Sequence, residues 1–219
     1  MVAKRLLIIP MLIICAGFAF CYFSPFANTN RNSDTLTASP IDIGFAQYMS
    51  VHHDQAVLLS QLLLDDRVVT DKRPSKLRNF ALSISTAQLI EIGTMRGWLQ
   101  LWGVETYPAT MDMNWMLLAP KLPSEELQQY LLDCRDSELG MPGLVKNSEL
   151  EELRKMDRDA RDARFLELML RHHEGGIPMA KFAAEFARLP VVRNLAQRMI
   201  IEQTKELMMM RRALNAITK

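Results

Sequence analysis

Four histidines in two adjacent pairs are the residues of this chain best suited to chemistry. Each pair closes an M-x-x-H-H motif, one at Met49/His52/His53 and the other at Met169/His172/His173, and the chain has no further histidine. On a helix, positions i, i+3 and i+4 share one face, so each motif brings one thioether and two imidazoles together. These donors suit copper, particularly Cu(I), better than calcium or magnesium.

The two motifs belong to a longer internal repeat. An offset of 120 residues places Asp42 on Asp162, Phe45 on Phe165 and the two motifs on each other. An offset of 115 residues then matches a glutamine, a glutamate and a methionine in each copy: Gln88, Glu91 and Met95 on Gln203, Glu206 and Met210. Each copy therefore predicts two helices joined by a turn, and two copies predict an all-α, ferritin-like four-helix bundle.

The second helix of each copy adds candidate ligands to the histidines. Its glutamate can bind a metal directly or hold the tautomer of a histidine that does. From the residues alone, the candidate metal ligands are His52, His53, His172, His173, Met49, Met169, Glu91, Glu206, Met95 and Met210.

A structural reading of the same residues remains open. Buried histidine pairs can be hydrogen-bonded elements of the core, and methionines can fill gaps in it. The matching places of all four histidines in both repeats favour a metal site over this reading. Met111, Met113 and Met116, around Trp115, fit either a second thioether cluster or a loop that covers the bundle.

Boundary signals divide the chain into an N-terminal segment and one bundle domain. We expect the domain at 41–219, with repeat one at 41–103, a connector at 104–156 and repeat two at 157–219. Asp42 is the expected N-cap of the first helix, and Gly103 should end the second. Pro178, inside the third helix, leaves the carbonyl of Glu174 without its donor and predicts a kink beside the second histidine pair.

The N-terminus indicates a route across a membrane. Lys4 and Arg5 precede an uncharged stretch from Leu6 to about Phe23, close to the shortest length that spans a bilayer. Residues 1–27 are therefore predicted to be a signal anchor or a cleaved signal peptide, followed by a polar tether at 28–40. The expected location is the cell envelope, with the N-terminus cytoplasmic and the domain extracytoplasmic, or secreted if the signal is cleaved.

Composition narrows the class of protein further. Lysine plus arginine (26) nearly balances aspartate plus glutamate (25), so no basic footprint for nucleic acid is evident. Only Cys134 lies outside the apolar N-terminal run, which argues against a disulfide framework. A bundle of this size often pairs with itself, so a homodimer stays open.

These motifs together resemble a bacterial family classified as domain of unknown function family 305. The resemblance rests on the first M-x-x-H-H motif, on Q-x-x-E-I-x-x-M-x-x-W-L-x-x-W-G from Gln88 to Gly103, and on M-P-G-L and H-H-E-G-G-I-x-M-A in the second half. It implies a ferritin-like four-helix bundle, usually secreted or membrane-tethered, with histidine and methionine as copper ligands. It adds Met179 as a candidate ligand, and the first copy has Leu59 at that place, so the first half-site should be weaker.

The leading hypothesis is an extracytoplasmic protein that binds Cu(I) or Cu(II) for sequestration, resistance or transfer and is not an enzyme. Zinc and iron fit the donor set less well. One alternative is a di-metal oxidoreductase, but those centres use Glu-x-x-His pairs, and here methionine stands three residues before each first histidine. The other alternative is a structural or interaction bundle without metal.

Overall fold

The computed structural model describes residues 37–65, 76–121 and 124–217. Helices account for most of these residues, and no strand occurs among them, so the predicted all-helical class is confirmed for this part of the chain. The elements are α1 (Pro40–Leu64), α2 (Arg78–Leu101), the short 3-10 helix η2 (Asn114–Leu118), α3 (Glu125–Asp136), α4 (Asn147–Lys155), α5 (Arg158–Phe186) and α6 (Pro190–Ile217).

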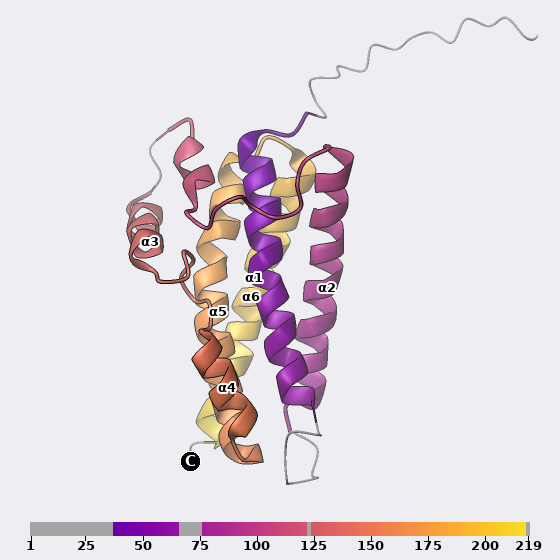
Figure 1. The fold of residues 1–219 in the computed structure, drawn as a ribbon, viewed down its shortest axis with the longest axis vertical. Coiled ribbons are helices and arrows are strands. Elements are labelled where there is room, and N and C mark those ends of the chain that lie inside the picture. The colour runs from indigo at the N-terminus through magenta and orange to yellow at the C-terminus, as the bar shows by residue number, and fades with distance from the viewer. Residues whose placement is uncertain (1–36, 66–75, 122–123, 218–219) are drawn as a thin grey trace, which may run out of the picture. The chain divides into compact units, whose positions relative to one another are not determined.

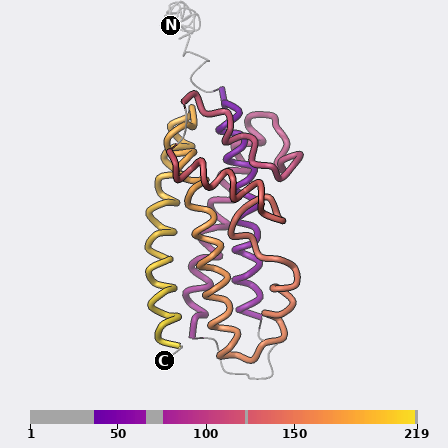
Figure 2. The backbone as a smooth tube through the Cα atoms, turned by 90° about the vertical axis from the view of Figure 1, so that its left-hand side faces the viewer, coloured from indigo at the N-terminus to yellow at the C-terminus, as the bar shows by residue number. Residues whose placement is uncertain are grey.

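The four long helices lie side by side as two hairpins. Helix α1 packs along α2, α5 packs along α6, and the two hairpins meet where α1 contacts α5. Figure 1 shows α1 descending and α5 rising, so the two central helices are antiparallel. Figure 2 shows α5 and α6 as neighbours over their whole length. Both histidine pairs lie on the central helices.

The start of α1 is fixed by a reciprocal cap. Ser39 is the N-cap, its hydroxyl accepts the backbone N–H of Asp42, and the Asp42 carboxylate accepts the N–H of Ser39 at 2.7 Å. The prediction that Asp42 is itself the N-cap was wrong, because the helix begins three residues earlier in a capping box. The other Asp42 oxygen accepts the N–H of Leu189 at 2.9 Å, which ties α1 to the turn between α5 and α6.

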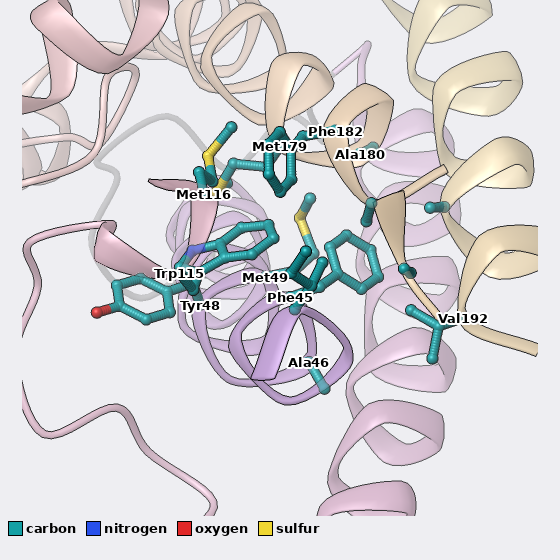
Figure 3. Packing of buried hydrophobic residues seen from close by; sticks show 14 of the residues in the cluster. Phe45, Ala46, Tyr48, Met49, Trp115, Met116, Met179, Ala180, Phe182 and Val192 are labelled. Atoms are coloured by element: carbon teal, nitrogen blue, oxygen red, sulfur yellow. The ribbon is translucent and has the colours of Figure 1, made fainter. Parts of the chain in front are cut away.

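Two apolar clusters fill the bundle, one on each side of the histidines along its axis. The first cluster lies around Phe45, Met49, Leu99, Met179 and Phe182. The second lies around Leu59, Leu63, Ile84, Phe165 and Met169. Figure 3 shows Met49, Met116 and Met179 among the aromatic rings of the first cluster. Because both clusters exclude the histidines, a polar band separates them.

The connector covers one face of the bundle rather than standing away from it. Figure 1 shows it crossing α1 and then running beside α5 through α3 and α4. Trp115 of η2 lies directly on Gly44 of α1, where an added Cβ would be 2.4 Å from the Trp115 Cβ. Met113 and Met116 are buried in the first apolar cluster. Of the two interpretations of this methionine group, the structure supports a loop that covers the bundle.

The connector also touches α5 beside the second histidine pair. Gly143 has a φ of +87°, and an added Cβ there would lie 2.6 Å from the carbonyl oxygen of Arg171. A Cβ on Gly175 would meet the carbonyl oxygen of Pro142 at 2.0 Å. Helix α5 runs through Pro178 as one helix, and the Tyr130 hydroxyl donates to the carbonyl oxygen of Gly175 at 2.8 Å. The M-P-G-L segment thus packs backbone to backbone against α5.

None of the described helices combines the length and apolar character that a bilayer-spanning helix needs. The predicted signal anchor or signal peptide at 1–27 lies outside the described residues, as does most of the polar tether at 28–40.

Candidate metal centre

A polar layer crosses the middle of the bundle between the two apolar clusters. We define it as His52 and His53 of α1, Gln88 and Glu91 of α2, His172 and His173 of α5, and Gln203 and Glu206 of α6. All four histidines have a relative exposure of 0%. The repeat predicted from the sequence therefore brings both histidine pairs together at one level of the fold.

The outer histidine of each pair is hydrogen-bonded to the glutamate of its own hairpin. Nε2 of His53 lies 2.8 Å from Oε2 of Glu91, and Nε2 of His173 lies 2.7 Å from Oε2 of Glu206. An ionised carboxylate can only accept, so Nε2 carries the hydrogen in both rings and Nδ1 keeps its lone pair. Of the two roles open to the glutamates, this geometry supports the one that holds a tautomer.

The inner histidines face each other across the contact between the two hairpins. The ring centroids of His52 and His172 are 3.7 Å apart, with the planes tilted by 35°. Nε2 of His172 lies 3.0 Å from the carbonyl oxygen of His52, so it too carries a hydrogen and leaves Nδ1 with a lone pair. Three of the four imidazoles are thus held in the same tautomer.

The layer forms a row of side chains through the bundle, from one surface to the other. Along it, the centroids of His52 and His53 are 6.2 Å apart and those of His172 and His173 are 6.1 Å apart. The Glu91 and Glu206 side chains at the two ends are 12% and 19% exposed. The histidines of the row are therefore buried, and the row is in contact with solvent at its two carboxylates.

Burial holds the inner histidines neutral. Loss of hydration lowers the pKa of His52 well below its ordinary value of 6.5, and the nearby His172, His53 and His173 lower it further. Burial likewise lowers the pKa of His172 well below 6.5, with His173 and His53 acting in the same direction. A neutral imidazole is the form that can bind a metal ion.

Several polar atoms of the layer have no hydrogen-bond partner among the described residues. They are Nδ1 of all four histidines, Nε2 of His52, and Oε1 of Gln88 and of Gln203. Buried polar atoms are nearly always paired, so this group of unpaired atoms at one level makes the layer the candidate binding place for a cation. These atoms fit a copper ion by donor type, because imidazole nitrogen is a good copper ligand.

The layer is not a finished coordination site. No three His, Cys, Asp or Glu side chains in the described part of the chain converge closely enough to hold a metal ion. The facing rings of His52 and His172 are one reason, since rings that overlap face to face with a tilt of only 35° do not direct their in-plane lone pairs at the same point. A bound ion would therefore need one ring to turn, or methionine and glutamine to complete its ligands.

The methionines predicted as ligands lie on either side of the layer. All are fully buried: Met49, Met95 and Met179 in the first apolar cluster, and Met169 and Met210 in the second. Leu59 lies in the second cluster, where the repeat would place the counterpart of Met179. The side of the layer with Leu59 and Met169 therefore has fewer candidate methionines than the side with Met49 and Met179. That the first half-site is weaker stays a prediction.

Sequence reasoning missed two features of the site. One is a pair of ion pairs outside the His–Glu contacts, Arg96 with Asp54 and Arg211 with Glu174, which the repeat offsets relate to each other. The other is Gly176, where an added Cβ would lie 2.7 Å from Cε1 of His52. The same self-comparison contained the signal for it, because Gly176 falls on Ala56.

Comparison with known proteins agrees with this architecture. A crystal structure of a DUF305 protein from Streptomyces coelicolor, described as a candidate secreted protein, is 30% identical, has a TM-score of 0.65, and covers 81% of this chain and 94% of its own. A DUF305 fragment from Deinococcus radiodurans is 23% identical, has a TM-score of 0.61, and covers 82% of this chain and 99% of its own.

A third solved structure, CopM in its Cu(II)-bound form, is 20% identical, has a TM-score of 0.55, and covers 80% of this chain and 96% of its own. At this identity the likeness shows a shared fold. A search of curated protein sequences finds no significant match. The model of the family described as Domain of unknown function (DUF305) matches residues 42–214, and the chain therefore belongs to the DUF305 family.

Proposed function

We propose that the polar layer binds copper and that this protein sequesters the ion or passes it on outside the cytoplasm. The observation that carries the proposal is the set of four buried Nδ1 atoms without partners. Three of them belong to rings whose Nε2 already binds an oxygen, which is how proteins prepare histidines for a metal.

The histidines, glutamates and methionines would have different roles in binding the ion. The imidazoles supply nitrogen ligands, and Glu91 and Glu206 keep the outer two in the right tautomer. Met49 and Met179 on one side, and Met169 on the other, offer sulfur that would favour Cu(I) over harder ions. Copper is the cargo in this proposal, and no chemical step on another molecule is required of the protein.

Two solved relatives support the proposal without deciding it. CopM carries Cu(II) on a bundle of the same fold. The Streptomyces coelicolor relative is described as a candidate secreted protein, which supports an extracytoplasmic location for this chain. Both observations belong to those proteins and reach this one through the shared family and fold.

The placement of the carboxylates favours binding over the alternative of a di-metal oxidoreductase. Such centres need carboxylates between two metal ions. Here Glu91 and Glu206 lie at opposite ends of the row, and each contacts one histidine of its own hairpin. We therefore propose a copper-binding protein rather than an enzyme, with zinc and iron as weaker fits to the donor set.

Copper titration of the full-length protein tests this function. The comparison is with a variant in which His52, His53, His172 and His173 are all alanine. We expect micromolar or tighter binding that the variant loses, with circular dichroism showing the same helix content in both. Equal weak binding in both proteins would favour a structural bundle. Oxygen consumption in the presence of iron would favour the oxidoreductase.

A further inference from the structure

The two halves of the polar layer are not equivalent, and His52 is where they differ. His53, His172 and His173 each have Nε2 within 3.0 Å of an oxygen. Among the described residues, neither ring nitrogen of His52 has a hydrogen-bond partner. The contact from His172 to the His52 carbonyl oxygen therefore has no counterpart in the other direction, although the repeat relates the two rings.

Gly176 explains where the His52 ring lies. A Cβ at this position would be 2.7 Å from Cε1 of His52, which is closer than real Cβ contacts allow. Glycine thus lets the ring sit against the backbone of α5. The matching residue of the first repeat is Ala56, so the two halves differ in the side chain at this position.

The position of His52 brings it near a second unpaired acceptor. Nδ1 of His52 and Oε1 of Gln203 each lie 3.3 Å from the point that a Gly176 Cβ would take. Gln203 is only 4% exposed, and neither atom has a partner among the described residues. Gly176 thus has an imidazole nitrogen and an amide oxygen beside it, both buried and neither hydrogen-bonded among the described residues, which is a pair of donor atoms that a bound metal ion would satisfy.

We propose that the layer takes up one metal ion per chain, in the half bounded by His52 and Gln203, and that Gly176 is the positioning residue that selects this half. The inference rests on the proposed function and adds the number of ions and their place. Gln203 is then a further ligand, with imidazole nitrogen and amide oxygen suited to Cu(II). The half with Ala56 and Gln88 binds no ion of comparable affinity.

Two matched pairs of variants of the full-length protein test the inference in Cu(II) titrations. The first pair is Gly176→Ala and Ala56→Gly, and the second is Gln203→Leu and Glu202→Leu, which alters an exposed neighbour on α6. We expect one equivalent of Cu(II) in the unaltered protein. Gly176→Ala and Gln203→Leu should each weaken binding by about tenfold or more, while Ala56→Gly and Glu202→Leu should change it by less than about threefold.

A readout without metal accompanies the titration. Long-range proton–nitrogen NMR of the apo protein should show His53, His172 and His173 protonated on Nε2. Gly176→Ala should shift the nitrogen signals of His52 more than those of His53. If Gly176→Ala fails to fold, the comparison of Gln203→Leu with Glu202→Leu decides.

The outcomes separate this inference from the function on which it rests. Two equivalents of equal affinity, or equal losses within each pair of variants, would overturn the inference and leave copper binding in place. Absence of Cu(II) binding by the unaltered protein would overturn both.

Discussion

At the scale of single residues, the arrangement of the histidines is set by oxygen atoms beside them. Glu91 and Glu206 each accept a hydrogen bond from Nε2 of one histidine of their own hairpin. The backbone carbonyl oxygen of His52 accepts one from Nε2 of His172. In each of these rings, Nδ1 therefore keeps its lone pair, and this atom is buried from solvent. In the copper site that we propose, the glutamates would therefore act through the histidines rather than as ligands of the ion.

Replacement of Glu206 by leucine should weaken both the fold and copper binding. The buried Nε2–H of His173 would lose its acceptor, which costs about 1–3 kcal/mol of unfolding free energy. Copper affinity should fall by roughly 10–100-fold because the tautomer is no longer held. Glu206→Gln should retain much of both, since the amide oxygen still accepts. Urea unfolding of the apo protein and copper titration measure the two effects.

Glu202→Leu serves as the control, because Glu202 is exposed on the same helix one turn away. It should leave copper affinity unchanged. A similar loss in both leucine variants would show that a general effect on α6, and not the His173 contact, is responsible.

Acid should destabilise the apo protein through the inner histidines. Burial lowers the pKa of His52 and His172 in the folded state, so below about pH 6.5 the unfolded chain binds protons that the folded protein does not. Stability is therefore fully present above about pH 6.5 and is lost as the pH falls toward the folded-state pKa values. The slope approaches about 1.4 kcal/mol per pH unit for each of the two groups.

Urea unfolding of the apo protein at pH 7.5, 6.5 and 5.5 measures this slope. A variant with glutamine at both positions should lose most of it. A flat profile in the unaltered protein between pH 6.5 and pH 5.5 would contradict the burial of neutral histidines.

At the scale of elements, the connector contributes to the fold through close contacts to glycines of the long helices. The ring of Trp115 lies on Gly44 of α1, and the M-P-G-L segment lies on Gly175 of α5. The two glycines of α2 have no such contact, because a Cβ on Gly93 or Gly97 would meet no described atom within 4 Å. Glycine thus has opposite roles at Gly44 and Gly93.

This difference predicts opposite effects of the same substitution. Gly44→Ala should destabilise the protein by about 1–3 kcal/mol, because its Cβ would overlap the Trp115 side chain. Gly93→Ala should stabilise it by about 0.5–1 kcal/mol, since alanine favours a helix and the site is open. Thermal unfolding of both variants, with the near-ultraviolet circular dichroism of the tryptophans, tests the pair. The prediction fails if the two variants shift the melting temperature in the same direction.

Helical periodicity and the repeat predicted the long elements because both depend on regularly spaced residues. The matching of Met49 to Met169 and Gln88 to Gln203 placed the histidines and their partners on four helices in register. The packing of the connector had no such signal, since Trp115 on Gly44 and Gly143 on Arg171 join residues far apart in the chain. The contact of His172 with the His52 carbonyl depends on how two hairpins meet, which local spacing does not encode.

At the scale of the whole molecule, one layer of side chains joins two hairpins. His52 and His172 come from different hairpins and face each other, while Asp42 binds the turn at the far end of α5. An ion held between histidines of α1 and α5 would therefore connect the two repeats. Binding of the ion should therefore increase the free energy of unfolding of the entire bundle.

Copper should raise the stability of the unaltered protein. A free ion concentration about 100 times the dissociation constant adds about 2.7 kcal/mol, which should raise the melting temperature by roughly 5–10 °C. Differential scanning calorimetry with and without Cu(II) measures the shift, and a chelator should reverse it. An equal shift in the variant without histidines would place the stabilising ion elsewhere.

Electron paramagnetic resonance of the full-length protein loaded with one equivalent of Cu(II) tests whether the buried imidazoles bind the ion. We expect nitrogen couplings from imidazole ligands, including those of the remote nitrogens, and their loss when His52, His53, His172 and His173 are replaced. A Cu(II) signal without imidazole couplings, or one that the replacement leaves unchanged, would contradict it.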